Sequence, residues 1–181
     1  MVEYLSEHFT LEEMTYSDTA KAKHISNTPT ATHKKTLKHT CEYCLEKIRT
    51  LLNNKYKEYK GKKVKQVSIK VTSGYRSSAL NAALPGASKT SGHCKGECAD
   101  IEAVIIFTDG KKEVLPFNVL YEDIKAWVRA GKVSVDQCIQ EQNSAGAKWC
   151  HVGHSASGAS KDRKQFLKYN HGTYSVDCIL K

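Results

Sequence analysis

The sequence has no long apolar run, and we expect no leader segment. No stretch approaches the ~18 uninterrupted apolar residues that a membrane-spanning helix needs. The first residues, Met1–His8, carry neither the basic nor the apolar segment of a secretory signal. Internal repeats, low-complexity tracts and linkers are also missing. We therefore expect one domain over residues 1–181, synthesised in the cytoplasm without a signal peptide, not inserted in a membrane, and monomeric.

The cysteines do not suggest a disulfide framework, because there are seven of them and no secretory signal. Cys41 and Cys44 form a C-x-x-C motif, but cysteine also behaves as a small apolar residue in a helix. Both lie in an apolar stripe at helical spacing, so we predict core packing for them. The stripe comprises Leu37, Cys41, Cys44, Leu45, Ile48, Leu51 and Leu52. Cys94, Cys98 and Cys150 lie beside candidate metal ligands and either bind metal themselves or line the site.

The chain is basic, with 28 Lys and Arg against 19 Asp and Glu and a net charge of +9. Such a charge favours polyanionic partners, which include nucleic acid, anionic membrane and anionic cell-wall polymer. The densest run, Lys55–Lys65, interleaves lysines with tyrosines, a combination that can bind single-stranded nucleic acid. The run has no arginine for reading base edges, so we interpret it as a solvated helix end and turn and expect no specific nucleic-acid partner.

The hydrophobic pattern predicts an α+β domain in which helices lead and a mostly antiparallel sheet follows. Thr10 and Glu13 have the spacing of a capping box at the start of a short helix. The other expected elements are a helix over 31–54, strands over 67–72 and 101–107, a hairpin return over 113–115, a helix capped by Asn118 and ended by Gly131, and strands over 133–142, 148–152 and 173–180.

Two histidines and one carboxylate are the strongest chemical signal. His93 and Asp100 lie in one short segment, and His151 follows about fifty residues later. Together they form a three-ligand zinc set with a fourth position left for water, whereas structural zinc sites are usually closed by four protein ligands. His93 also fits an ordinary loop residue, and His151 fits a histidine satisfied inside the core. We expect His154 at the solvent-exposed rim rather than among the ligands.

Hydrolysis at such a site needs a carboxylate that takes a proton from water and passes it to the leaving amine. Glu141 is the best candidate, because it ends a strand that we expect to pair with the strand of His151. Arg76 can hold a substrate carboxylate or carbonyl by a bidentate contact. Either residue also fits a surface charge or a salt bridge.

The sequence motifs around these residues resemble those of a known family. The motifs are Ser73-Gly-Tyr-Arg76, then Ser91-x-His93-x-x-Gly96-x-Cys98-Ala-Asp100, and finally Trp149-Cys-His151. They resemble the zinc D-Ala-D-Ala carboxypeptidase family, which includes phage and prophage peptidoglycan endopeptidases. The segments Phe9–Glu13 and Ile25–Pro29 are also similar to phage members, so that the resemblance covers nearly the whole chain.

The resemblance implies zinc on His93, Asp100 and His151, with Arg76 engaging the substrate. It implies the fold shared with the hedgehog signalling domain, and a zinc metallopeptidase that cuts a peptide bond of peptidoglycan. Such an enzyme is either a D,D-carboxypeptidase or an endolysin-type endopeptidase, and it acts on the cell wall after release by a separate lysis route. The alternative is a non-catalytic, zinc-containing module of the same fold that binds cell wall or another protein.

Two positions depart from the family pattern. Cys98 stands where the motif usually has alanine, which exchanges one small residue for another. Many relatives carry the catalytic acid three residues before the last histidine, and here that residue is Lys148. A protonated lysine cannot act as a general base, so Glu141 must reach the site from the neighbouring strand.

Overall fold

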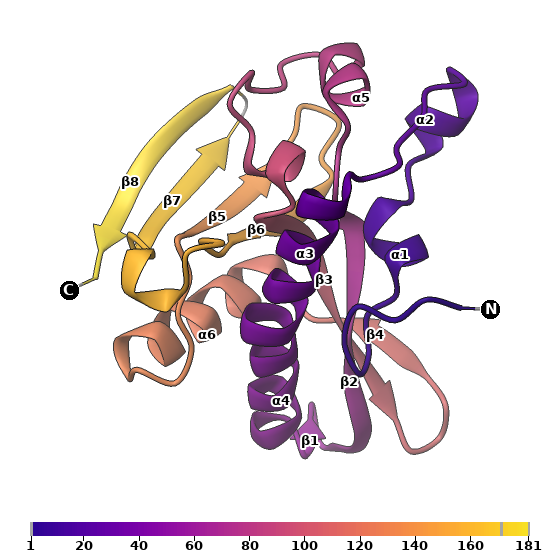
Figure 1. The fold of residues 1–181 in the computed structure, drawn as a ribbon. Helices are drawn as coiled ribbons and strands as arrows, with labels where there is room; N and C mark the ends of the chain where they lie inside the picture. Colours follow the sequence, from indigo (N-terminus) through magenta and orange to yellow (C-terminus); the bar gives the residue numbers. More distant parts are fainter. Residues whose placement is uncertain (1, 171, 181) are drawn as a thin grey trace.

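The computed structural model describes residues 2–170 and 172–180, which form a mixed α+β structure around one eight-stranded sheet (Figure 1). The strand order is β1-β2-β3-β6-β5-β7-β8, and β4 pairs with β3 outside this path. The strands are β1 (Glu58–Tyr59), β2 (Lys62–Ser73), β3 (Cys98–Phe107), β4 (Lys112–Val114), β5 (Gln137–Gln142), β6 (Lys148–Gly153), β7 (Gln165–Asn170) and β8 (Thr173–Ile179).

Neighbouring strands run antiparallel except for β5 and β7, which are parallel. The expected mostly antiparallel sheet is therefore confirmed. The helices are α1 (Leu11–Thr15), α2 (Asp18–Ala22), α3 (Ala31–Thr40), α4 (Glu46–Lys55), α5 (Ser78–Ala83) and α6 (Phe117–Arg129), with a π-helical turn η1 (Cys41–Leu45) and 3-10 turns η2 (Gly92–Lys95) and η3 (Ala159–Lys161). Among these elements, no helix is long and apolar enough to cross a membrane.

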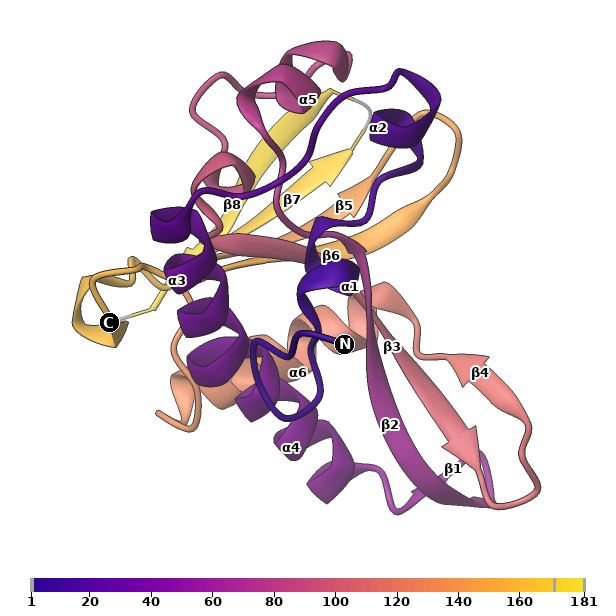
Figure 2. The ribbon, with the colours of Figure 1, turned by 45° about the vertical axis from the view of Figure 1, so that its right-hand side comes forward.

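One face of the sheet is buried against α4 and α6. Both helices lie to the same side of β2 and β3 in Figure 2. Ile101 and Ile105 of β3 contribute to the core that also contains Ile48 of α4 and Ile124 of α6. Each such side chain, when fully buried, contributes roughly 1.5–3 kcal/mol. Because side chains alternate along a strand, Asp100 between two core residues must point to the opposite face.

The long helix predicted over 31–54 is confirmed as α3, η1 and α4 in direct succession. Its start is capped by Thr30, whose side chain accepts a hydrogen bond from the amide of His33. The π-helical turn was not predicted, because apolar residues continue at three- and four-residue spacing through Cys41–Leu45. Cys41 and Cys44 are fully buried in the core, as expected, and burial raises the pKa of both thiols.

Several boundaries differ from the sequence prediction. Asn118 is not the cap of α6, because the carbonyl of Pro116 already accepts hydrogen bonds from the amides of Val119 and Leu120. The strand expected over 133–142 begins only at Gln137, after an irregular segment in which Val135 is buried. The helices α2 and α5 and the strands β1 and β7 were not predicted. The capping box at Thr10 is confirmed by its hydrogen bond from the amide of Glu13.

Candidate active site

Asp100 and His151 face each other on the side of the sheet away from α4 and α6. They are directly paired across β3 and β6, so their side chains project from neighbouring positions on one face. His93 arrives from the η2 turn, which leads into β3. The structure therefore brings together the three residues that the sequence suggested as ligands, from a turn and two adjacent strands. His93 is 1% exposed and Asp100 is 8% exposed.

The three donor atoms form a compact triangle. His151 Nδ1 lies 2.9 Å from Asp100 Oδ1 and 3.2 Å from His93 Nε2. The third side, from His93 Nε2 to Asp100 Oδ1, measures 3.3 Å. A tetrahedral zinc ion with bonds of about 2.0–2.1 Å holds its ligand atoms about 3.3 Å apart. The donor set and its spacing therefore fit zinc.

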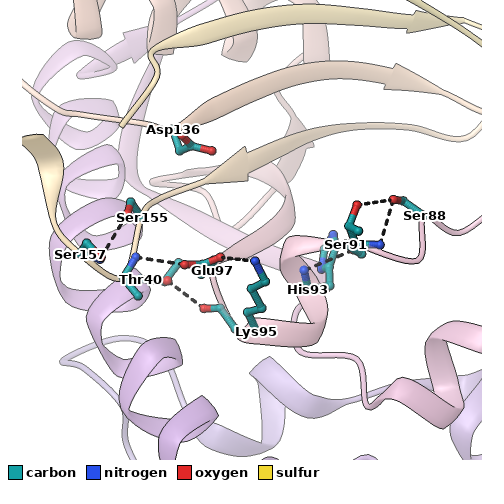
Figure 3. A network of polar contacts seen from close by, with 12 residues as sticks. Thr40, Ser88, Ser91, His93, Lys95, Glu97, Asp136, Ser155 and Ser157 are labelled. Atoms are coloured by element: carbon teal, nitrogen blue, oxygen red, sulfur yellow. Dashed lines mark hydrogen bonds and ion pairs between the residues drawn. The ribbon is translucent and has the colours of Figure 1, made fainter. Parts of the chain in front are cut away.

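The ring of His93 is oriented by the backbone. Its Nδ1 donates a hydrogen bond of 2.6 Å to the carbonyl oxygen of Gly74. Because a carbonyl only accepts, Nδ1 carries a proton, and Nε2 is the ring nitrogen that faces Asp100 and His151. Such outer contacts fix the tautomer and orientation of metal-binding histidines. Ser91 steadies the same turn, since its hydroxyl accepts from the amide of His93 (Figure 3).

Two glycines of the family-like motifs are required by close approaches. A Cβ on Gly74 would lie 2.3 Å from the backbone oxygen of Met14, so only glycine allows α1 to pack there. Gly96 ends η2 with a φ of +77°, and a Cβ on it would lie 2.9 Å from the carbonyl oxygen of His33. Thr40 of α3 donates to the carbonyl of Gly96 at 2.9 Å. The contacts of Gly96 hold the turn carrying His93 against α3, and the contact of Gly74 holds the carbonyl that accepts from His93 against α1.

The charges in this cluster stabilise one another. Burial alone would raise the pKa of Asp100, but the imidazoles of His93 and His151 hold it well below its usual range. Burial alone would lower the pKa of His93, but Cys98 and Asp100 raise it to about 9. The same two anionic groups raise the pKa of His151 well above its ordinary value, against the effect of burial. The cluster thus favours positive charge at its centre, as a cation site requires.

Glu141 joins the cluster from β5. It pairs with Trp149 of β6, which places it diagonally across from His151 on the same face. Its carboxylate lies within 4.8 Å of ligand atoms of both Asp100 and His151. Burial, and then the negative charge of Asp100, raises the pKa of Glu141. A half-buried carboxylate with a raised pKa is well suited to accept and return a proton.

Lys148 does not enter this site. It lies an odd number of residues before His151 on β6, so its side chain projects from the opposite face. Its ammonium group lies 5.4 Å from the centre of the Phe117 ring at the start of α6. The lysine therefore leaves the space beside His151 free for the carboxylate of Glu141.

Arg76 borders the cluster on its other side. Its Nη2 lies 3.7 Å from Asp100 Oδ2, and the side chain is 16% exposed. The Nε atom is buried and has no hydrogen-bond partner among residues 2–170 and 172–180. Asn27 fixes the backbone around Arg76, because it bonds to the carbonyl of Tyr75 and to the amide of Ser77. A guanidinium held in place with a free donor is suited to bind a substrate oxygen.

The cysteines near the cluster differ in position. Cys150 projects to the core face, where its thiol donates to the carbonyl of Phe117. Cys94 is half-buried in η2. Only Cys98 has its sulfur grouped with the ligand atoms of His93 and His151 in the described chain. Burial alone would raise its pKa, but the two imidazoles lower it to about 7.

His154 is not at the solvent-exposed rim, and that expectation was wrong. The residue is 2% exposed. Its Nδ1 donates to Asp162 at 2.8 Å, and its ring stacks on His39 with the centroids 5.1 Å apart. The glycine and serine beside it suggested a loop, but the ion-pair partner eight residues later buries the ring.

Aromatic residues continue the site's face toward the edge of the sheet, and no sequence motif predicted that they lie together. Tyr169 pairs with Glu141 across β5 and β7, and Tyr174 of β8 pairs with Tyr169. The two tyrosine rings lie 4.5 Å apart, and Tyr174 is 58% exposed. Trp149 of β6 pairs with Glu141 on the side opposite to Tyr169, and it lies two residues before His151 on the same face. Trp149, Tyr169 and Tyr174 thus lie beside Glu141, and we call these three residues the aromatic wall.

Comparisons with known proteins agree with this geometry. A search of curated proteins finds no match. The family model described as Peptidase M15 matches residues 7–109, which is more than half of the chain. The matched span includes Arg76, His93 and Asp100, whereas Glu141 and His151 lie beyond it and are brought to the same place by the sheet. The chain therefore belongs to peptidase family M15, the family of the zinc D-Ala-D-Ala carboxypeptidases.

Proposed function

We propose that this protein is a zinc-dependent peptidase that hydrolyses a peptide bond in peptidoglycan. The observation that carries the proposal is the triangle of donor atoms from His93, Asp100 and His151, with sides of 2.9–3.3 Å and with the carboxylate of Glu141 beside it. These three residues would hold the zinc ion. The donor set leaves room for water, as catalytic zinc sites do.

A bound zinc ion supplies two effects, a lowered pKa for water and a polarised substrate carbonyl. The protein's own residues carry the proton and position the substrate. Glu141 takes a proton from the attacking water and delivers it to the nitrogen of the departing amine. Arg76 binds a substrate carboxylate or carbonyl oxygen through its free donors. Kinetic experiments on variants of Glu141 and of Arg76 can therefore test proton transfer and substrate contact separately.

The proposed substrate is the peptide of peptidoglycan, cut either as a D,D-carboxypeptidase or as an endolysin-type endopeptidase. The net charge of +9 favours an anionic cell wall. The aromatic wall of Trp149, Tyr169 and Tyr174 gives the substrate a surface to pack on. By resemblance, we propose a phage or prophage enzyme with the fold shared with the hedgehog signalling domain, released to the wall by a separate lysis route.

The test is digestion of purified peptidoglycan followed by mass spectrometry of the released fragments. We expect the zinc-loaded protein to release fragments whose masses identify the bond that is cut, and a chelator to stop their release. Glu141→Gln keeps the size of the side chain but cannot accept the proton, so we expect zinc stoichiometry to stay and turnover to fall by 10²–10⁴-fold. Glu113→Gln, on the distant strand β4, is the matched control and should be fully active.

Full activity of the Glu141→Gln protein would show that another group handles the proton. Stoichiometric zinc and wall binding without any cleavage product would instead support the non-catalytic alternative. That alternative was motivated by Lys148, whose side chain lies over Phe117 on the other face of the sheet. We therefore favour the peptidase.

A further inference from the structure

Cys98 projects into the candidate metal centre for a simple geometric reason. It precedes Asp100 by two residues within β3, and residues two apart on a strand share a face. The side chain is 1% exposed. Its position is the one at which the family motif usually has alanine, so the sulfur is an addition that this chain makes to the site.

The surroundings of the sulfur are shaped to admit it. Cys98 pairs with Gly153 on β6, so no side chain stands directly opposite. A Cβ on Gly92 would lie 3.1 Å from the Cys98 Sγ, closer than side-chain atoms normally approach. Gly92 thus leaves volume that the sulfur occupies, whereas a Cβ on Gly153 would make only an ordinary contact of 3.8 Å with the Cys98 Cβ. The sulfur is packed tightly between η2 and β6, on the side where the imidazoles lie.

The sulfur is also within reach of the metal. The Sγ of Cys98 and the ligand nitrogens of His93 and His151 all lie within 4.8 Å of one another. In a tetrahedral zinc site with Zn–S and Zn–N bonds of ~2.3 and ~2.0 Å, sulfur and nitrogen ligands are about 3.5 Å apart. The bound of 4.8 Å is wider than this spacing, so binding of one ion would draw the three ligand atoms closer together.

We propose that the Cys98 thiolate is a fourth protein ligand of the metal, which it binds together with His93, Asp100 and His151. This inference rests on the proposed function only in that the cluster binds a metal ion. A thiolate makes the site softer than two imidazoles and a carboxylate alone, so that it favours zinc, cobalt or cadmium over magnesium or manganese. Zinc can expand to five ligands during catalysis, so a bound thiolate leaves room for hydrolysis.

The test is the absorption spectrum of the protein loaded with cobalt(II). A thiolate bound to cobalt gives a strong charge-transfer band in the near ultraviolet, whereas histidine and carboxylate ligands do not. We expect the band in the unmodified protein and its loss in Cys98→Ala, with one cobalt still bound per chain. Cys94→Ala is the matched control, because Cys94 lies on the same turn but outside the cluster, and it should keep the band.

Cys98→Ser provides a second variant of nearly the same size in case the alanine variant folds poorly, and it should also lose the band. Cobalt bound at full stoichiometry without the band in the unmodified protein would overturn the role of Cys98 and leave the peptidase proposal intact. A band that persists in both Cys98 variants would overturn it as well. Failure to bind cobalt or zinc at all would instead remove the proposed function.

Discussion

The surroundings of Arg76 suit its guanidinium group to the substrate contact that we propose. Its guanidinium lies beside Asp100, yet its Nε is buried without a partner in the part of the chain that the structure describes. A buried polar atom without a partner costs free energy, and the substrate contact that we propose would give this atom a partner. For this contact, the planar arrangement of the guanidinium donors matters as much as the positive charge.

We therefore expect Arg76→Lys to lower kcat/KM by roughly 10- to 100-fold, the value of one lost hydrogen bond to a charged group. The lysine keeps the positive charge but offers only one point of contact. Zinc stoichiometry should not change, and Arg129→Lys on the outer surface of α6 should have no effect. Steady-state kinetics on a muropeptide would check this, and an unaltered kcat/KM for Arg76→Lys would contradict the proposed contact.

Residue identity alone could predict much of the site, but not which side chains share a face of the sheet. His93, Asp100 and His151 were recognisable because their types and order suggest a metal site. Cys98 was recognisable only as one of three cysteines that either bind metal or line the site, because no apolar and polar alternation marks Cys98-Ala-Asp100 as the start of a strand. Once β3 begins at Cys98, the shared face follows from strand geometry.

At the scale of elements, the η2 turn depends on its contact with α3. Gly96 combines a left-handed backbone with close packing, because a Cβ there would also lie 2.9 Å from the Cγ of Leu37. Gly61 has nearly the same backbone, with a φ of +73°, but a Cβ on it would meet nothing within 4 Å. The two glycines therefore separate the cost of backbone strain from the cost of the clash.

We expect Gly61→Ala to lower the free energy of unfolding by about 1 kcal/mol, from backbone strain alone. Gly96→Ala should lose roughly 1–3 kcal/mol more, because the added methyl group must push η2 away from α3. Zinc affinity should fall only in Gly96→Ala, since His93 moves with the turn. Urea unfolding and zinc titration would check both, and equal losses in the two variants would contradict the packing argument.

Strand β7 was missed by the sequence analysis for a physical reason. Strand β7 pairs in parallel with β5, and its partner lies more than twenty residues away. Phe166 is buried and Leu167 nearly so, but lysines on both sides of them made the segment look like a charge run. The long helix of α3 to α4 was predictable, because its apolar stripe is local. Pairing between distant strands leaves no comparable local pattern.

At the scale of the whole molecule, the site joins parts of the chain that are far apart in sequence. A metal held by His93, Asp100 and His151 would cross-link the η2 turn to β3 and β6, near the middle of the sheet. Glu141 adds β5, whose other neighbour is β7. The donors come together only when these strands are paired, so the metal binds the folded chain and not the unfolded chain.

Zinc should therefore stabilise the fold by mass action. At a free concentration a thousand times the dissociation constant, the gain is about 4 kcal/mol, which for a chain of this size corresponds to a rise in Tm of roughly 10 °C. Chelation should remove this rise. In His151→Ala the Tm should no longer respond to zinc, whereas replacing the exposed His24 by alanine should leave the response intact. Calorimetry of the three proteins with and without chelator gives the answer, because an equal response in His151→Ala would place the metal elsewhere.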